Sequence, residues 1–173
     1  VKIAGYPAGT NYEYTFRVEH GVLKAAYDQY DGDFDNRFGH IFFDRPFSHY
    51  IIAVEYRFVG EQASGAPEWA LRNSGVMVHS QSAESMGVDQ DFPISIEVQL
   101  LGGTGTGERT TANLCTPGTH VVIDGELLSQ IMITSAVESF PPTTVPGIND
   151  AVELGLGTDV PLRARGAVAL LLP

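Results

Sequence analysis

The chain has little cysteine, few cationic residues and no long hydrophobic run, and each scarcity excludes a class of protein. Cys115 is the one cysteine, so no intrachain disulfide can form. Ten Lys and Arg stand against 21 Asp and Glu, giving a net charge of −11 at pH 7. Because a nucleic-acid surface needs clustered cations to neutralise phosphates, we expect no nucleic-acid partner. The longest apolar run, residues 167–172, is far shorter than the roughly 18 residues of a membrane span.

What is present favours one all-β domain over residues 1–173. The chain contains 19 Gly and 10 Pro but lacks long periods rich in Ala, Glu, Lys, Leu and Arg, which is typical of many short strands joined by turns. Its 173 residues suffice to bury a core. The sequence begins at Val1 without a signal peptide. We expect a secreted or periplasmic protein whose targeting segment is not part of this chain.

Alternation of apolar and polar residues predicts most of the strands. A hairpin turning at His20 and Gly21 is expected, and a turn at Asp124 and Gly125 predicts a second one. One helical turn is expected at residues 83–86, and no longer helix. The expected strands are residues 12–19, 22–27, 38–44, 50–58, 73–79, 94–100, 119–123, 152–156 and 167–172.

Two of these expected strands carry polar pairs on one face. Glu55 and Arg57 alternate with apolar residues in 50–58, and Glu97 and Gln99 do so in 94–100. If both strands lie in one sheet, two carboxylates, a guanidinium and an amide converge, which suits sugar hydroxyls. The alternative is the solvated outer face of an antiparallel sheet.

The expected strand 73–79 adds a second group. In a regular strand Asn73, Gly75, Met77 and His79 share a face. Gly75 leaves room for a ligand or another backbone to approach. His79 is the histidine best placed for proton transfer or for binding a metal, and a half-buried structural histidine is the alternative.

An acidic loop offers hard oxygen ligands at Asp28, Asp31, Asp33 and Asp35. These residues resemble a calcium loop in composition, but the glycine that an EF-hand requires is missing. Asp and Gly are also the usual turn formers, so we interpret the segment as a turn.

A glycine-rich segment, the cysteine and the tryptophan each have an ordinary structural explanation. The glycine-rich residues 102–107 lack the Lys-Ser/Thr of a phosphate-binding loop, so a mobile flap is expected. Cys115 is expected to be a buried structural thiol. Trp69, the one tryptophan, suits either stacking on a sugar ring or packing in the core.

Four segments together resemble a known family: FGHIFFDRPFSHYIIAVEYRFVGEQ, PEWALRNSGVMVHSQ, DFPISIEVQLLGG and TANLCTPGTHVVIDGEL. They are similar to the bacterial domain of unknown function 1080, described as the 3-keto-disaccharide or 3-keto-glycoside hydrolase domain. The resemblance covers residues 12–128. Residues 131–173 are atypical of it, because the Trp-led strand and the closing hairpin of the family are not recognisable there.

The resemblance implies a concanavalin-like jelly roll, a sandwich of two curved antiparallel sheets with the site on the concave face. It also implies a carbohydrate ligand and an enzyme that removes the proton at C2 of a 3-keto sugar and cleaves the glycosidic bond. The positions carried over are Glu55, Arg57, Asn73, Ser74, Glu97 and Gln99, and Trp69 joins them as a substrate-binding aromatic residue.

The expected catalytic roles fall on four residues. Glu97 or His79 is the base, Arg57 stabilises the enolate, and Glu55 is the acid or a metal ligand. A divalent metal ion held by His79 and the glutamates is an alternative stabiliser of the enolate.

Three rival functions remain open from the sequence. The first is a conventional glycoside hydrolase, which needs two carboxylates about 5 Å or about 6.5–9.5 Å apart. The second is a non-catalytic carbohydrate-binding domain with exposed aromatic residues, and the third is a structural domain with a solvated polar face. The sugar, its linkage and the oligomeric state are left open.

Overall fold

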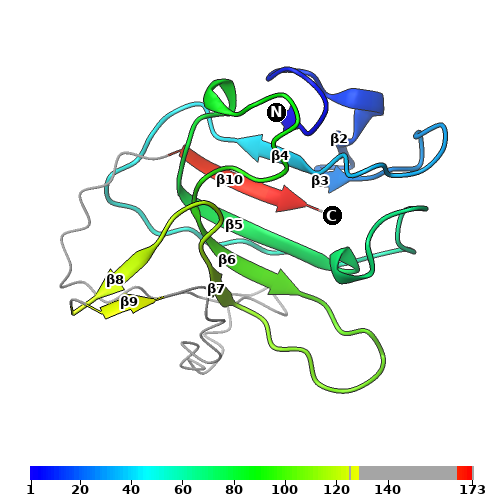
Figure 1. Cartoon of the computed structure of the whole chain (residues 1–173). Coiled ribbons are helices and arrows are strands. Elements are labelled where there is room, and N and C mark those ends of the chain that lie inside the picture. The colour runs from blue at the N-terminus through cyan, green and yellow to red at the C-terminus, as the bar shows by residue number, and fades with distance from the viewer. Residues whose placement is uncertain (125, 129–166, 173) are drawn as a thin grey trace.

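A computed structural model describes residues 1–124, 126–128 and 167–172. The described chain contains strands and short 3-10 helices but no α-helix, which confirms the all-β prediction. Its largest unit is a six-stranded antiparallel sheet in the order β1-β4-β10-β5-β6-β7 (Figure 1). These strands are β1 (Lys2–Ile3), β4 (Gly39–Phe42), β5 (Asn73–Ser80), β6 (Ile96–Leu101), β7 (Asn113–Cys115) and β10 (Ala167–Leu172).

Two hairpins accompany the large sheet. β2 (Phe16–Glu19) pairs with β3 (Val22–Ala25), and β8 (Val121–Ile123) pairs with β9 (Glu126–Leu128). Both hairpins were predicted from their turns. The 3-10 helices are η1 (Tyr12–Tyr14), η2 (Glu68–Ala70) and η3 (Ala83–Ser85), the last at the predicted helical turn.

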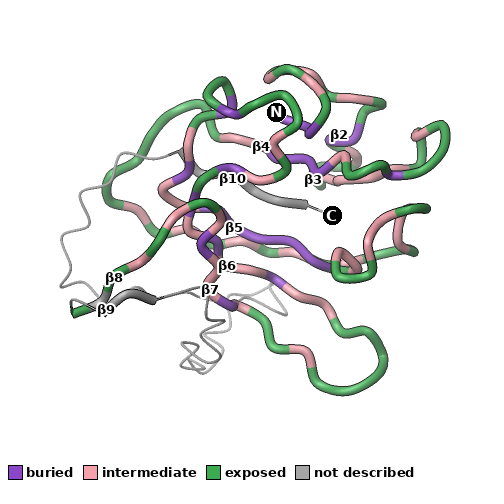
Figure 2. Tube along the Cα trace, viewed as in Figure 1, coloured by how far each residue is buried: buried purple, intermediate pink, exposed green. Residues whose placement is uncertain are grey.

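The two faces of the large sheet carry different residues, because cross-strand partners share a face. One face, called here the polar face, contains Asn73, Gly75 and Met77 of β5 opposite Leu101, Gln99 and Glu97 of β6. The other face carries Val76 opposite Val98 and Ser74 opposite Leu100. Figure 2 shows β5 buried along most of its length, as expected for a strand between two neighbours.

The β2–β3 hairpin covers the second face near β4. The ring of Phe16 lies within 2.8–2.9 Å of the position that a Cβ at Gly39 would occupy, and Ile3 lies at 3.6 Å. Both Phe16 and Ile3 are buried. Gly39 therefore permits the close packing of an aromatic ring against the sheet backbone.

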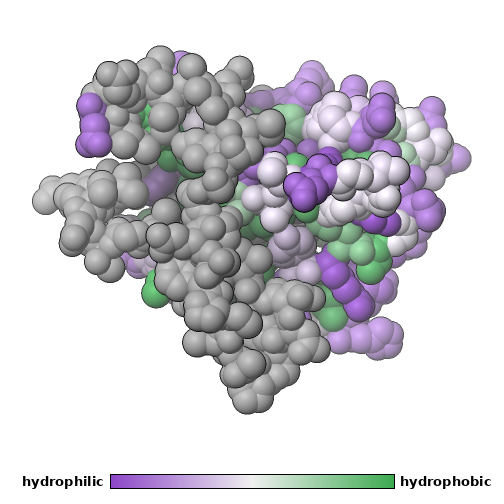
Figure 3. All heavy atoms as spheres, turned by 90° about the horizontal axis from the view of Figure 1, so that it is seen from below, coloured by the Kyte–Doolittle hydropathy of each residue, from purple (hydrophilic) through white to green (hydrophobic). Residues whose placement is uncertain are grey.

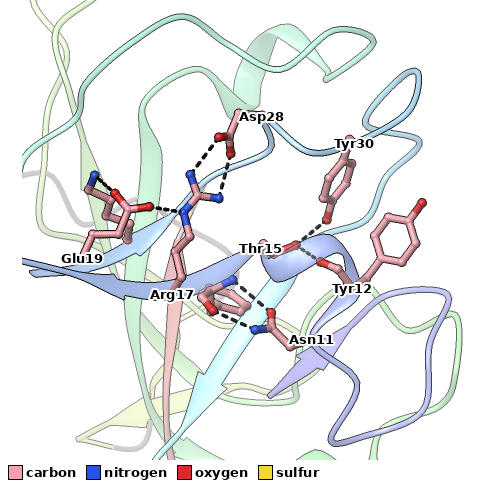
Figure 4. A network of polar contacts seen from close by, with 9 residues as sticks. Asn11, Tyr12, Thr15, Arg17, Glu19, Asp28 and Tyr30 are labelled. Carbon is pink, nitrogen blue, oxygen red and sulfur yellow. Dashed lines mark hydrogen bonds and ion pairs between the residues drawn. The ribbon is translucent and has the colours of Figure 1, made fainter.

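A polar network fixes the entry to this hairpin (Figure 4). The Asn11 side chain donates to the Phe16 carbonyl at 2.7 Å and accepts from its N–H at 3.0 Å. The Thr15 hydroxyl donates to the Tyr12 carbonyl at 2.6 Å and lies 2.8 Å from the Tyr30 hydroxyl. These contacts hold η1 and the loop after β3 against the start of β2.

The predicted strand 50–58 is absent from the sheets. The alternation of the segment is still visible, because Ile52, Val54, Tyr56 and Phe58 are partly buried and the residues between them are exposed. The segment pairs, however, with no strand of the described chain. β10 lies between β4 and β5, and β6 is the other neighbour of β5, so both edges of β5 are already paired. The strand prediction for 50–58 is therefore wrong, although the apolar side of the segment still faces the protein.

The predicted strand 167–172 is confirmed as β10, in the middle of the sheet. The predicted strand 152–156 lies outside the described residues. Among the described residues, no helix has the length and hydropathy needed to cross a bilayer. Hydrophilic residues gather along the outer edge of the described surface seen from below, with hydrophobic ones scattered between them (Figure 3).

Candidate functional site

The polar face of the large sheet brings Glu97 into the interior. Glu97 lies on β6, directly opposite Met77 of β5 on one side and Cys115 of β7 on the other. Its side chain is 7 % exposed, and it is the one buried carboxylate among the described residues. Met77 is fully buried and packs against Phe42 and Phe92, so the carboxylate adjoins the hydrophobic core.

The side chain of Glu97 extends across Gly75 on the neighbouring strand. A Cβ at Gly75 would lie 2.7 Å from Cγ and 2.8 Å from Cδ of Glu97. The close approach predicted at Gly75 is therefore made by a carboxylate side chain. The absent side chain at Gly75 is what lets Glu97 lie flat over the sheet.

Burial changes the acid–base behaviour of Glu97. Loss of solvent raises the pKa of this carboxyl to about 7, because the charged form is poorly stabilised in the interior. Its Oε1 atom is inaccessible to solvent, and no described residue donates a hydrogen bond to it. A carboxylate with a pKa near neutrality and a free oxygen is suited to take up and release a proton.

Cys115 is half-buried opposite Glu97 and shares its environment. Burial raises the pKa of the Cys115 thiol to about 11, and the charge of Glu97 adds to this effect. The thiol is thus kept protonated at neutral pH, in keeping with the predicted structural role.

Amide side chains continue the polar face on both sides of Glu97. Asn113 of β7 is opposite Gln99, and its Nδ2 donates to Gln99 Oε1 at 3.1 Å and to the Thr110 carbonyl at 3.2 Å. Asn73 of β5 is buried, and its Nδ2 donates to the Trp69 carbonyl at 3.2 Å. Asn73 and Gln99 were predicted as site residues. Asn113 was not, because its strand is only three residues long and shows no alternation that marks it.

Ser74 and His79 do not extend this face in the expected way. Ser74 belongs to the opposite face, as the partner of Leu100, and is buried there. The pairing of β5 with β10 shifts register near His79, and the residue adopts a left-handed φ of 52°. The regular alternation that would align His79 with Met77 therefore stops before it.

Trp69 lies in η2, close to Asn73 at one end of the polar face. Its ring stacks on Phe38, with centroids 5.3 Å apart and planes 20° apart, and the residue is 52 % exposed. Phe38 precedes β4 and is itself buried. One face of the indole packs on Phe38 while about half of the residue is open to solvent, so the packing role is observed and the stacking of a sugar on Trp69 stays a prediction.

Two arginines tie the glycine-rich loop to the segment that holds Trp69. Arg109 donates to the carbonyls of Trp69, Leu71 and Gly102. Arg72 donates to the Gly103 carbonyl at 2.6 Å. Figure 1 shows this loop, between β6 and β7, beside η2. A guanidinium surrounded by backbone carbonyls positions a loop, a role that the sequence pattern did not reveal.

Glu55 and Arg57 are not part of the polar face, because their segment is not a strand of the large sheet. Both are exposed, and no described residue forms an ion pair with either. The segment ends at Phe58, whose ring lies 2.6 Å from the position of a Cβ at Gly102, just after β6. The expected convergence of Glu-x-Arg and Glu-x-Gln in a single sheet is not formed, because residues 50–58 are not a strand of it.

The acidic loop serves local structure. Arg17 holds Asp28 through two contacts of 2.8 and 2.9 Å, and Ser64 donates to Asp33 at 2.6 Å (Figure 4 shows the Asp28 pair). Asp31, Asp33 and Asp35 border an open hollow of about 450 Å³ with Arg37. Among the described residues, no three His, Cys, Asp or Glu side chains lie close enough to hold a metal ion.

One protein family matches the chain over most of its length. Residues 3–146 match the model of the 3-keto-alpha-glucoside-1,2-lyase-like domain. The chain belongs to this family. The match contains the whole of residues 12–128, and the suspected resemblance is confirmed. The all-β architecture agrees with the concanavalin-like sandwich expected of the family. No curated protein and no solved structure matches the chain significantly.

Proposed function

We propose that this chain cleaves the glycosidic bond of 3-keto-glycosides, with Glu97 as the base that removes the proton at C2. Membership of the 3-keto-alpha-glucoside-1,2-lyase-like family supports the substrate class. The observation that carries the assignment of the base is the burial of Glu97, which raises the pKa of its carboxyl to about 7 and leaves Oε1 unpaired. A base is most effective when its pKa lies near the working pH.

The reaction is an elimination followed by the addition of water. The ketone at C3 acidifies the C2–H bond, Glu97 takes the proton, and the bonding electrons form the enolate. As the C3 carbonyl re-forms, a C1–C2 double bond is made and the C1–O bond breaks. The aglycone oxygen leaves with the electron pair of the C1–O bond and takes up a proton. Protonated Glu97 can supply this proton. Addition of water to the double bond completes hydrolysis.

The enolate oxygen needs a hydrogen-bond donor. Gln99 lies two residues from Glu97 on β6 and shares its face. Its Oε1 accepts from Asn113, and no described residue accepts a hydrogen bond from its Nε2, so this group can donate to a ligand. We propose Gln99 as this donor, and Arg57 and Glu55 remain hypotheses from the sequence, since both are exposed outside the sheet. A chelator tests whether a divalent ion stabilises the enolate instead.

A conventional glycoside hydrolase is less well supported. That mechanism needs two carboxylates that flank the bond and differ in protonation. Glu97 is the one buried carboxylate of the described residues, and no pair with it is formed across the sheet. A purely binding domain has no need of a carboxyl with a pKa near 7, so the environment of Glu97 favours chemistry over binding alone.

The test is cleavage of 3-keto-trehalose and 3-keto-sucrose against the parent disaccharides, with and without a chelator. We expect cleavage of the oxidised sugars only, and slower cleavage when C2 carries deuterium. Glu97→Gln should lower kcat by about 10²–10⁴-fold, the usual contribution of a general base. Glu61→Gln, an exposed carboxylate, is the matched control.

Two outcomes would contradict the proposal. Cleavage of parent disaccharides at a comparable rate would indicate ordinary hydrolysis without C2 proton removal. Unchanged activity of Glu97→Gln would remove Glu97 as the base. Loss of activity with chelator, restored by added metal, would assign enolate stabilisation to a metal ion in place of Gln99.

A further inference from the structure

The Thr110 carbonyl, which can only accept hydrogen bonds, fixes the orientation of the Asn113 side-chain amide. Asn113 is fully buried, and its Nδ2 lies 3.2 Å from the Thr110 carbonyl oxygen. A carbonyl oxygen only accepts hydrogen bonds, so the NH₂ group must face it. The same NH₂ group donates to Gln99 Oε1 at 3.1 Å. The orientation of Gln99 is thereby fixed as well, with Oε1 toward Asn113.

The oxygen of Asn113 has no partner among the described residues. Asn113 Oδ1 is buried, and none of them donates a hydrogen bond to it. Asn73 repeats this arrangement on β5, since its Nδ2 donates to the Trp69 carbonyl while its buried Oδ1 is unpaired. Glu97 Oε1 is unpaired in the same way, and His40, His79 and Thr116 also have unpaired buried polar atoms elsewhere in the described chain. Buried acceptors without donors are rare in proteins, and they mark functional sites among other causes.

The three acceptors belong to one surface. Asn113 and Gly75 are the partners of Gln99 on its two sides, Glu97 precedes Gln99 by two residues, and Asn73 precedes Gly75 by two. Neighbouring strands lie about 4.7–4.9 Å apart, so β5 and β7 are separated by about 10 Å. Opposite hydroxyl groups of a sugar ring, each with a hydrogen bond to an amide side chain, together cover about this distance, with Gln99 between the two ends.

The chemistry of the set favours hydroxyl groups over a cation. Two of the three acceptors are neutral amides, and only Glu97 carries charge. The described residues provide no group of three His, Cys, Asp or Glu for a metal. Sugar hydroxyls donate hydrogen bonds and remain neutral, which matches amide oxygens in a buried site.

We propose that Asn113 is a specificity-determining residue of this site. Its Oδ1 accepts a hydrogen bond from one sugar hydroxyl and Asn73 Oδ1 accepts from another, while Glu97 Oε1 is left to act as the base. Its Nδ2 holds Gln99 so that Gln99 Nε2 donates to a sugar oxygen. This inference rests on the proposed function for the class of ligand, but concerns recognition and not the chemical step.

The experiment combines removal of a hydroxyl from the sugar with removal of its acceptor from the protein. A series of 3-keto-glucosides, each lacking one hydroxyl, is compared in the wild type and in Asn113→Ala. We expect one deoxy sugar to lose about tenfold in kcat/KM with the wild type, and to lose nothing further with Asn113→Ala. Asn73→Ala should behave in the same way toward a different hydroxyl.

Controls separate recognition from folding. Thr116→Val removes another buried, unpaired polar atom, just beyond β7, and should leave the pattern of deoxy sugars unchanged. If Asn113→Ala fails to fold, Asn113→Ser retains a small polar side chain for the same comparison. Circular dichroism and the melting temperature report on folding in each variant.

The same comparison is made for binding alone, with Glu97→Gln and calorimetric Kd values for the same sugars. Coupling between one hydroxyl and Asn113 in Kd supports the inference even if no 3-keto-glycoside is cleaved. Deoxy sugars whose losses are equal in wild type and Asn113 variants overturn it, even if cleavage is confirmed. Absence of binding by every sugar overturns it as well.

Discussion

The carboxylate of Glu97 lies over the backbone of Gly75, which belongs to the adjacent strand. The carboxylate occupies the space that a side chain at position 75 would take. This contact keeps the acid flat against the sheet, on the same face as its buried cross-strand partner Met77. The raised pKa of Glu97 and the orientation of its free oxygen both depend on this arrangement.

Replacement of Gly75 by Ala should therefore displace Glu97. The new methyl group would lie 2.7–2.8 Å from Glu97 Cγ and Cδ, closer than carbon atoms tolerate. We expect kcat on 3-keto-glycosides to fall by about 10²-fold, since small displacements of a catalytic group have effects of this size. Overpacking should also lower the free energy of unfolding by about 1–3 kcal/mol.

Gly103→Ala is the control for this substitution, because a Cβ at Gly103 meets no atom within 4 Å. Its activity should remain that of the wild type. Wild-type kcat in folded Gly75→Ala would show that the position of Glu97 over Gly75 has no bearing on turnover.

The pH dependence of stability should report on Glu97. The pKa of this carboxyl is about 7 when folded, against the ordinary value of 4.5, so protonation favours the folded state. This contribution is complete below about pH 4.5 and is lost as the pH rises through about 7. The two pKa values correspond to a change of at most about 3 kcal/mol.

Urea unfolding of the wild type and of Glu97→Gln between pH 4.5 and 8 measures this effect. The variant lacks the titrating group, so its stability relative to the wild type should increase across that range. A constant difference between the two proteins at every pH would contradict the raised pKa.

Arg109 should act as a positioning residue for Trp69 and the glycine-rich loop. Arg109→Met removes the donor to the carbonyls of Trp69, Leu71 and Gly102. We expect KM to rise by about tenfold while kcat changes less, because the loop is loosened and the base is untouched. The fluorescence of Trp69, the one tryptophan, should shift toward that of a more exposed indole.

Arg109→Lys, which keeps one charged donor, should recover part of the wild-type KM. Arg45→Met removes an exposed arginine on another loop and is the control. Equal effects of Arg109→Met on kcat and KM, without a fluorescence change, would contradict a positioning role.

The rate at which Cys115 is alkylated tests whether its thiol lies beside Glu97. With its thiol pKa raised to about 11, alkylation by iodoacetamide at pH 8 should be about 100-fold or more slower than that of a free thiol. Glu97→Gln removes the charge that raises the thiol pKa alongside burial, so labelling should become modestly faster. Rapid labelling of the folded wild type would show that Cys115 is not held beside a buried carboxylate.

Most of the strands could be predicted from local pattern. β5 and β6 alternate clearly, and the two hairpins have turn residues where they are needed, so their existence follows from the spacing of residues in the chain. Residues 50–58 alternate just as clearly, yet they pair with no described strand, and the two edges of β5 are taken by β6 and by β10 from the other end of the sequence. Alternation shows which side of a segment is buried but does not say which strand becomes its neighbour.

The site divides in the same way. Residue identity and the two-residue period of a strand are enough to predict that Glu97 and Gln99 share a face, that Gly75 lacks a side chain where something approaches, and that the chain resembles its family. That Glu97 fills the space over Gly75, and that Asn113 fixes Gln99, becomes visible when the strands are packed together. Cross-strand register and burial set hydrogen-bond partners and pKa values, and both arise only when segments distant in sequence are packed together.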